Sequence, residues 1–163
     1  MADSGASAFI FLMTALIVSA SVSAILVDSW KGIADTYADG RDKAALDAKT
    51  EISFAGNPMM VSYDPATTTM VFYLQNTGES MLESNVGGVF VDGERPCGSV
   101  SSTLQGGATV WAPGGILRVT SVCNTWTYSV SPASEINLLL IATSEVSMGV
   151  RGTDSLYLDA RLN

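Results

Sequence analysis

Residues 4–27, SGASAFIFLMTALIVSASVSAILV, form an uncharged and mostly apolar stretch between Asp3 and Asp28. Seventeen of these twenty-four residues are Ala, Val, Ile, Leu, Met or Phe. Because a helix rises about 1.5 Å per residue, a helix of this length is ~36 Å long and can cross a hydrocarbon core of ~30 Å. The Leu, Ile, Phe and Val residues alone favour insertion by roughly 3 to 7 kcal/mol. The stretch therefore predicts a helix that can span a membrane.

The same stretch is also compatible with a cleaved signal peptide, a buried core helix or a helix packed among copies of itself. Val22-Ser23-Ala24 resembles a small-residue cleavage site, but no Lys or Arg precedes the apolar run, whereas export signals begin with a basic segment. A buried core helix needs a large enclosing domain, which the polar, β-patterned remainder of the chain does not predict. Packing among copies in a filament core, with or without lipid contact, stays open beside the membrane span.

Small side chains recur at four-residue intervals within the stretch, at Ala15, Ser19 and Ser23, and Ala20 and Ala24 lie beside them. In lipid, helices associate where small residues let their backbones approach closely and where hydroxyls bond across the seam. The spacing therefore predicts that this helix associates with other helices along the stripe. A lone membrane anchor with incidental serines is the alternative.

The helical pattern continues past the apolar run as an amphipathic segment, with charged residues on its other faces. Its apolar positions are spaced mostly by three or four and are Trp30, Ile33, Tyr37, Ala44, Ala48 and Ile52. Gly32 and Gly40 each cost ~1 kcal/mol relative to Ala, and neither is a decisive stop. We expect one rod of about 45 to 50 residues, ~70 Å long, that forms an N-terminal domain of residues 1–50.

The rod is expected to assemble with neighbouring rods through side chains of both segments. A helix that is partly exposed to water and carries a narrow apolar stripe is usually a linker that packs on its own domain. The same stripe is also suited to packing against other rods. The candidate assembly residues are Phe9, Leu12, Ala15, Leu16, Ser19, Ala20, Ser23, Ala24, Trp30, Ile33 and Tyr37.

The charge composition of the chain limits the kinds of molecule that it can bind. Eight Lys and Arg stand against sixteen Asp and Glu, which gives a net charge of −8, and no basic cluster occurs. Nucleic acid is therefore an unsuitable partner. About 110 residues follow the rod, which is enough for one domain with its own core, and we place this domain at residues 51–163.

Short runs of β-branched and aromatic residues fill this second domain. They lie at residues 71–74, 89–91, 116–119, 126–130, 136–142 and 155–158, with turn residues such as Asp92-Gly93 and Pro113-Gly114-Gly115 between them. Seven or eight short strands without helical pattern between them predict an antiparallel β-sandwich of immunoglobulin-like type. The fold class expected for the whole chain is α+β, a long N-terminal hydrophobic helix followed by this sandwich.

Cysteine and histidine usage bears on cross-links, metals and catalysis. A disulfide between Cys97 and Cys123 would close a loop of about 26 residues and contribute roughly 3 to 4 kcal/mol, and two buried free thiols are the alternative.

The chain contains no histidine, which removes the commonest general base and any Ser-His or Cys-His pair. Asp92 and Glu94 flank a turn glycine and are expected to be solvated, with a calcium ligand pair as the lesser alternative. We expect no catalytic, cofactor or metal site.

The opening MADSGASAFIFLMTALIVSASVSAILVD, together with three later motifs in the same order, resembles the archaellum-associated protein G family (FlaG, also called ArlG). The motifs are Val71-Phe72-Tyr73-Leu74-Gln75-Asn76-Thr77-Gly78 with Leu82, Val89-Phe90-Val91-Asp92-Gly93 and Trp111-Ala112-Pro113-Gly114-Gly115. Each motif alone is common in secreted immunoglobulin-like domains, so the specificity lies in the helix and in the order of the motifs.

The resemblance implies a pilin-like subunit whose helices assemble into a stator filament between the motor membrane and the surface layer. The implied partners are the related archaellum protein F, which contacts the surface layer, and the surface-layer protein itself. Typical archaellins carry a processed class III leader and a Glu at the fifth mature position. This chain lacks both features, which weakens the case for a major filament archaellin without excluding it.

The location that we expect is the cell membrane and the archaellum, with a short cytoplasmic N-terminus and an external, pseudoperiplasmic C-terminal domain. Lys31 close behind the span favours the opposite orientation only weakly. A structural filament subunit is the leading hypothesis, and a monomeric membrane-anchored domain that binds a surface protein or glycan is the alternative.

Overall fold

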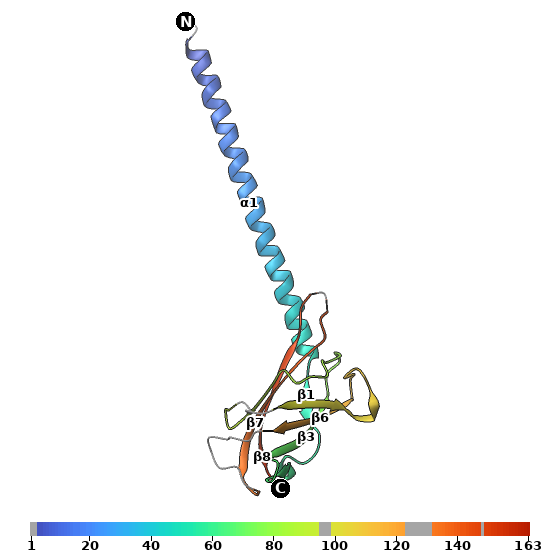
Figure 1. The fold of residues 1–163 in the computed structure, drawn as a ribbon. Helices are drawn as coiled ribbons and strands as arrows, with labels where there is room; N and C mark the ends of the chain where they lie inside the picture. The colour runs from blue at the N-terminus through green and yellow to red at the C-terminus, as the bar shows by residue number, and fades with distance from the viewer. Residues whose placement is uncertain (1–2, 95–98, 123–131, 148) are drawn as a thin grey trace. The chain divides into compact units, whose positions relative to one another are not determined.

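The computed structural model describes residues 3–94, 99–122, 132–147 and 149–163 (Figure 1). The chain divides into two compact units, Met1–Arg41 and Asp42–Asn163. The first unit is helical. The second contains the last turns of the same helix and all the strands that the structure describes, and we call it the β unit.

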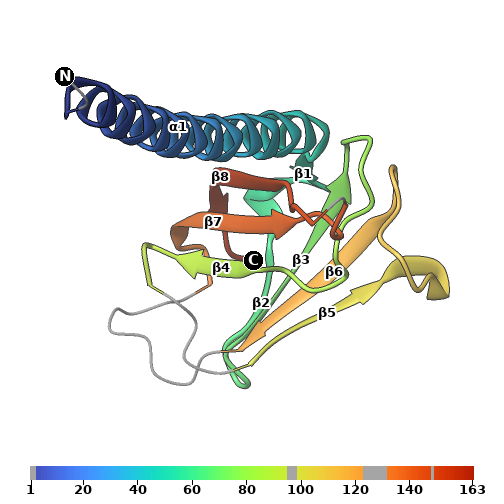
Figure 2. The same cartoon turned by 90° about the horizontal axis from the view of Figure 1, so that it is seen from above.

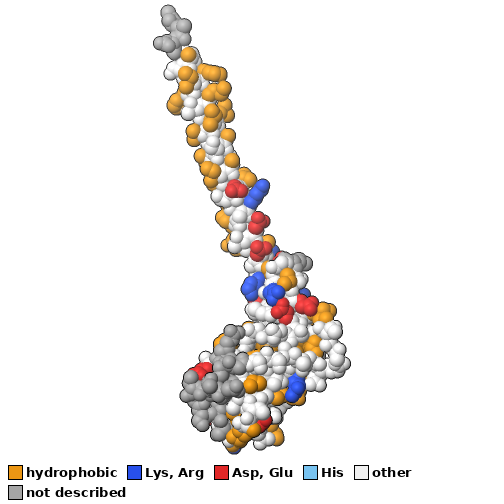
Figure 3. Space-filling view, viewed as in Figure 1, with side chains coloured by type: hydrophobic (Ala, Val, Ile, Leu, Met, Phe, Trp, Pro, Cys, Tyr) orange, Lys and Arg blue, Asp and Glu red, His pale blue; other side chains and the backbone are white. Residues whose placement is uncertain are grey.

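Helix α1 runs without interruption over 47 residues, Asp3–Lys49. The segment contains no proline, so every backbone N–H after its first turn can join the helical ladder. Large apolar side chains cover its first half and charged side chains appear in its second half (Figure 3). The predicted long apolar N-terminal helix is therefore confirmed.

The predicted apolar stripe extends one position too far. Ile52 does not lie on the helix, because α1 ends at Lys49, and Ile52 instead begins the first strand with its side chain buried in the core. The spacing of four from Ala48 predicted that Ile52 continues the helical stripe. Burial of its side chain in the core of the β unit instead favours the strand conformation.

The strands form two antiparallel sheets. One has five strands in the order β1-β3-β6-β5, with β2 also paired to β3, and the other has three in the order β4-β7-β8. Their bounds are β1 (Ile52–Phe54), β2 (Ser62–Asp64), β3 (Thr69–Asn76), β4 (Gly88–Val91), β5 (Val100–Leu104), β6 (Ile116–Val122), β7 (Glu135–Thr143) and β8 (Thr153–Arg161). Two short 3-10 helices, η1 (Pro58–Met60) and η2 (Gln105–Gly107), lie between strands.

The two sheets share one hydrophobic core and form two layers in Figure 2. Alternate residues of β3 and β6, among them Phe72 and Leu117, enter the core from the five-stranded sheet. Leu138 and Leu140 enter it from β7 of the three-stranded sheet. This alternation is the period-2 pattern of strands with one covered face, and it confirms the α+β class.

Five of the six predicted strand segments coincide with β3, β4, β6, β7 and β8. The sixth, residues 126–130, lies outside the described residues. The sequence did not predict β1, β2 and β5. The first two have only three residues each, and β5 has the Ser- and Thr-rich sequence VSSTL, which carries little apolar signal.

Candidate functional site on the N-terminal helix

All eleven predicted assembly residues lie on α1 with exposed side chains. Among the large ones, exposure runs from 48% for Ile33 to 73% for Tyr37. An apolar surface of this extent is uncommon on a soluble monomer and marks a surface that contacts protein or lipid.

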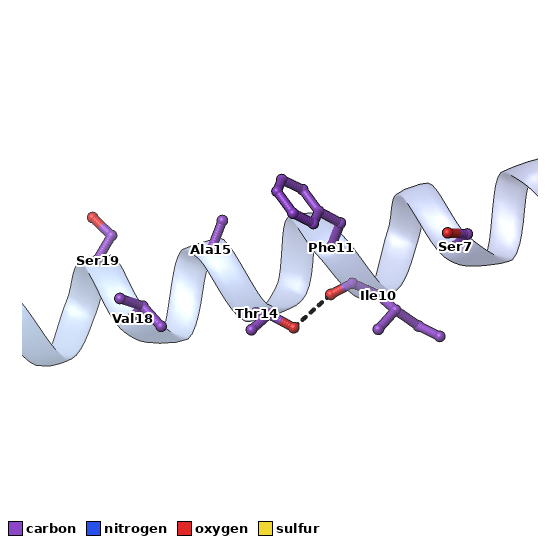
Figure 4. Close-up of a pocket in the computed structure, with 7 residues that line it drawn as sticks. All are labelled: Ser7, Ile10, Phe11, Thr14, Ala15, Val18 and Ser19. Atoms are coloured by element: carbon purple, nitrogen blue, oxygen red, sulfur yellow. Dashed lines mark hydrogen bonds between the residues drawn. The ribbon is translucent and has the colours of Figure 1, made fainter.

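Two shallow grooves run along the first half of α1 and share a central row of four residues. This central row comprises Ser7, Phe11, Ala15 and Ser19, spaced by four. Ile10, Thr14 and Val18 complete the first groove (Figure 4), and Ala8, Leu12 and Leu16 complete the second. The structure thus places four predicted residues, Leu12, Ala15, Leu16 and Ser19, on these grooves.

Phe11 is the largest of the groove residues that the sequence interpretation missed, the others being Ser7, Ala8, Ile10, Thr14 and Val18. It is 79% exposed and stands in line with Ala15 and Ser19, so a large ring interrupts a row of small side chains. The four-residue spacing of the stripe, continued toward the N-terminus, would have found it. A protruding ring beside small residues is the arrangement by which a knob on one helix enters a hollow on another.

The hydroxyl groups of α1 fall into two classes. Those of Thr14 and Ser21 each donate to the carbonyl oxygen four residues earlier, at 2.8 Å, so they add little polarity to the surface. Over the described part of the chain, no hydrogen bond engages the hydroxyls of Ser19 and Ser23. These two remain available to a neighbouring helix.

The last turn of α1 is bonded to the loop that follows β3. The carbonyl oxygen of Lys49 accepts hydrogen bonds from the backbone N–H groups of Glu79 at 2.9 Å and Ser80 at 3.1 Å. The carbonyl oxygen of Glu51 accepts from Thr77 and Gly78, each at 3.0 Å. Carbonyl groups at a helix end lack helical partners, and here the β unit supplies them.

Two glycines allow this close approach. A Cβ atom at Gly78 would overlap the carbonyl oxygen of Lys49 and lie 2.6 Å from the nitrogen of Glu51. A Cβ atom at Gly152 would overlap the hydroxyl of Thr50 and lie 2.7 Å from the carbonyl oxygen of Leu46. The obstacles are mostly backbone atoms, which cannot rotate away, so glycine is required at both positions.

Carboxylates complete the attachment of the helix end. One Asp47 oxygen accepts the backbone N–H of Thr153 at 2.8 Å, and Lys43 donates to the other at 2.9 Å. The hydrogen bond from Lys43, followed by that from Thr153, lowers the pKa of Asp47 below its ordinary value of 3.8. Asp154 accepts the backbone N–H of Ile52 at 2.8 Å.

The remaining candidate residues are the two cysteines and the Asp92-Gly93 turn. Cys97 and Cys123 lie outside the described residues, so their pairing stays a prediction. Asp92 and Gly93 form the predicted tight turn, with φ angles of 48° and 81°. One Asp92 oxygen accepts the backbone N–H of Asn137 at 2.7 Å, which ties the turn to β7.

Comparison with known proteins identifies a family for most of the chain. Among solved structures, the secreted serine protease VesC from Vibrio cholerae is similar at 18% identity over 78% of this chain, with a TM-score of 0.31. The chain spans about a quarter of that protein, 25%, and the likeness carries no functional inference. A comparison with curated proteins found no match. The family model for archaeal-type flagellin matches residues 2–151, and the chain therefore belongs to the archaeal-type flagellin family of structural filament subunits.

Proposed function

We propose that this protein is a non-enzymatic subunit of the archaellum machinery that assembles through α1 into a stator filament. The observation that carries the proposal is the exposed apolar surface of α1, with its two grooves along the central row. Membership of the archaeal-type flagellin family supports filament formation by the chain.

The grooves favour helix–helix packing over lipid contact alone. Lipid tails solvate any apolar side chain equally well. Contact with lipid therefore does not explain why the large Phe11 ring stands in line with the small residues Ala15 and Ser19. A second helix does benefit, because its backbone can approach the small residues and its hollows can receive the ring. The free hydroxyls of Ser19 and Ser23 can bond across the same seam.

Before assembly, α1 would hold the subunit in the membrane. By length and composition, the helix from Gly5 to Lys49 is sufficient to cross a bilayer. We place a short N-terminus in the cytoplasm and the β unit outside the membrane, where an oxidising environment would also suit a Cys97–Cys123 disulfide. Exchange of lipid for other helices then converts the anchor into a filament core.

The stator assignment depends on the motif order shared with the archaellum-associated protein G family, and on the absence of Glu from residues 4–27. The partners proposed on that resemblance are archaellum protein F and the surface-layer protein. The second candidate function is a subunit of the main archaellum filament, which the family match favours equally.

Electron microscopy of the full chain after detergent removal tests the assembly step. We expect the wild type to polymerise, and Ala15→Phe or Ser19→Leu to prevent polymerisation while circular dichroism shows an intact β unit. Ser21→Leu is the matched control, because Ser21 lies outside both grooves and bonds within its own helix. A wild type that stays monomeric would favour the anchored binding domain instead.

A deletion strain separates the stator from the main filament. A strain without a stator subunit should still carry archaella on its surface but should not swim, because rotation needs a fixed reference. A strain without the main filament subunit should carry no archaella.

A further inference from the structure

Strand β7 has large apolar side chains on both faces of its central part, between polar residues at the two ends of its outer face. Ile136, Leu138, Leu140 and Ala142 point into the core, whereas Leu139 and Ile141 alternate with them on the opposite, solvent-side face, where they are half-buried. An antiparallel sheet with one face in water usually alternates apolar and polar residues, and continuous apolar runs are typical of strands covered on both sides. The sequence of β7 thus predicts that something covers its second face.

Neighbouring strands extend this apolar surface. Leu139 lies opposite Phe90 of β4 on one side and opposite Tyr157 of β8 on the other, and Tyr157 is 65% exposed. A Cβ atom at Gly88 would lie 3.0 Å from the Phe90 ring and 3.4 Å from the side chain of Ile141, so both side chains lie over this glycine. We call Phe90, Leu139, Ile141 and Tyr157 the outer apolar face.

At one end of the outer apolar face lie Asp159 and the register pair Glu135 and Arg161, so that two carboxylates stand against one cation. Asp159 pairs in register with Asn137, whose side-chain oxygen accepts a 2.6 Å hydrogen bond from the Tyr157 hydroxyl. Asp92 is bonded to the backbone of Asn137 from the other side. Over the residues that the structure describes, Asp159 has no ion-pair partner.

The five-stranded sheet presents a solvent face of complementary character. Tyr73, Arg118 and Thr103 form one cross-strand row on β3, β6 and β5, and Ile116 lies beside them. Arg118 is the only charged residue in these three strands, and the other two strands of the sheet add one carboxylate, Asp64 at the end of β2, opposite Thr69. We call Val71, Tyr73, Ile116 and Arg118 the Arg118 face.

We infer that the outer apolar face of one subunit packs on the Arg118 face of a second copy of this chain. Apolar and aromatic side chains would form the centre of the contact, and the carboxylates around Asp159 would meet Arg118, since opposite charges at an interface favour one partner and one register. The two faces belong to opposite layers of the β unit, so the contact joins different surfaces and repeats from subunit to subunit. The inference rests on the proposed filament function and adds a second contact to it, outside α1.

Charge reversal in the full-length chain tests this contact. Arg118→Glu and Asp159→Arg, each alone, should raise the critical concentration for polymerisation about tenfold, and the double variant should return it to near the wild-type value. Glu79→Arg is the matched control, because Glu79 is exposed and lies outside both faces. It should leave polymerisation unchanged.

The outcomes separate this inference from the proposed function. If the wild type polymerises and Ala15→Phe prevents polymerisation, but single charge reversals have no effect or the double variant fails to recover, the face-to-face contact is wrong and assembly through α1 stands. A wild type that forms no polymer overturns both.

Leu139→Ser provides a second measurement that does not alter charge. It should weaken polymerisation while the melting temperature of the β unit shows that the variant is folded.

Discussion

The side-chain amide of Asn76 donates a hydrogen bond to the backbone carbonyl of Trp111 over 3.1 Å, which joins two fully buried residues 35 positions apart. The same amide donates to Ser80 at 2.8 Å, and its oxygen accepts the N–H of Gly78 at 3.1 Å. The indole N–H of Trp111 donates to Gly115 at 2.8 Å. Two of the sequence motifs on which the family resemblance depends therefore meet in space, next to the loop that holds the end of α1.

Replacing Asn76 should destabilise the β unit strongly. Asn76→Ala removes three hydrogen bonds, to the half-buried Gly78 and Ser80 and to the buried Trp111 carbonyl, although Gly78 and Trp111 each keep a backbone partner. We expect a loss of about 2 to 4 kcal/mol in the free energy of unfolding. Denaturant unfolding followed by tryptophan fluorescence measures it. Asn57→Ala, which removes an exposed cap from η1, should cost only about 1 kcal/mol, and equal losses in the two variants would contradict this role of Asn76.

Adding a methyl group at either junction glycine should loosen the end of α1. Gly152→Ala and Gly78→Ala push against backbone atoms of Leu46 and Glu51, and each should lower the melting temperature of the β unit markedly. Hydrogen exchange at the N–H groups of Glu79 and Ser80 should become faster. Gly32→Ala is the control, because no atom lies within 4 Å of its added Cβ and alanine favours the helix. Unchanged exchange in the junction variants would argue against a requirement for glycine there.

Acid should weaken the same junction. The pKa of Asp47 is lowered in the folded state by the hydrogen bonds from Lys43 and Thr153, so its stabilisation is complete above about pH 4 and is lost as the pH falls through the folded-state pKa. Asp47→Asn should therefore flatten the dependence of stability on pH below about 4. Thermal unfolding across this range checks the prediction. Asn57→Ala, which changes no ionisable group, should keep the wild-type slope.

The ring of Phe11 should contribute more to assembly than other exposed rings of α1. Phe11→Ala removes the protruding member of the central row, and burial of a phenylalanine is worth roughly 1.5 to 3 kcal/mol, so the critical concentration for polymerisation should rise about tenfold or more. Phe9→Ala removes the same side chain at an exposed position outside both grooves and should have a smaller effect. Sedimentation of polymers at graded concentrations measures both, and equal effects would remove the special role of Phe11.

The helix and most strands could be predicted because their signals are local. The uncharged run from residue 4 to residue 27, the amphipathic spacing after it and the absence of proline predict α1, and period-2 apolar runs mark β3, β6 and β7. Ala15 and Ser19 were found at the grooves for the same reason, since residues four apart share one face of a helix. Phe11 was missed because the expected stripe consisted of small residues only.

Two features follow from the sequence alone, namely the long apolar rod and the class of the domain after it. Both depend on periodicity within one element. Tertiary structure alone decided where the rod ends, that Asn76 joins Trp111, that Gly78 and Gly152 touch the helix end, and that Leu139 and Ile141 stand on the solvent side of β7. These relationships depend on contacts between distant segments, and no local pattern determines which backbone will approach a glycine or which face of a strand its own core will cover.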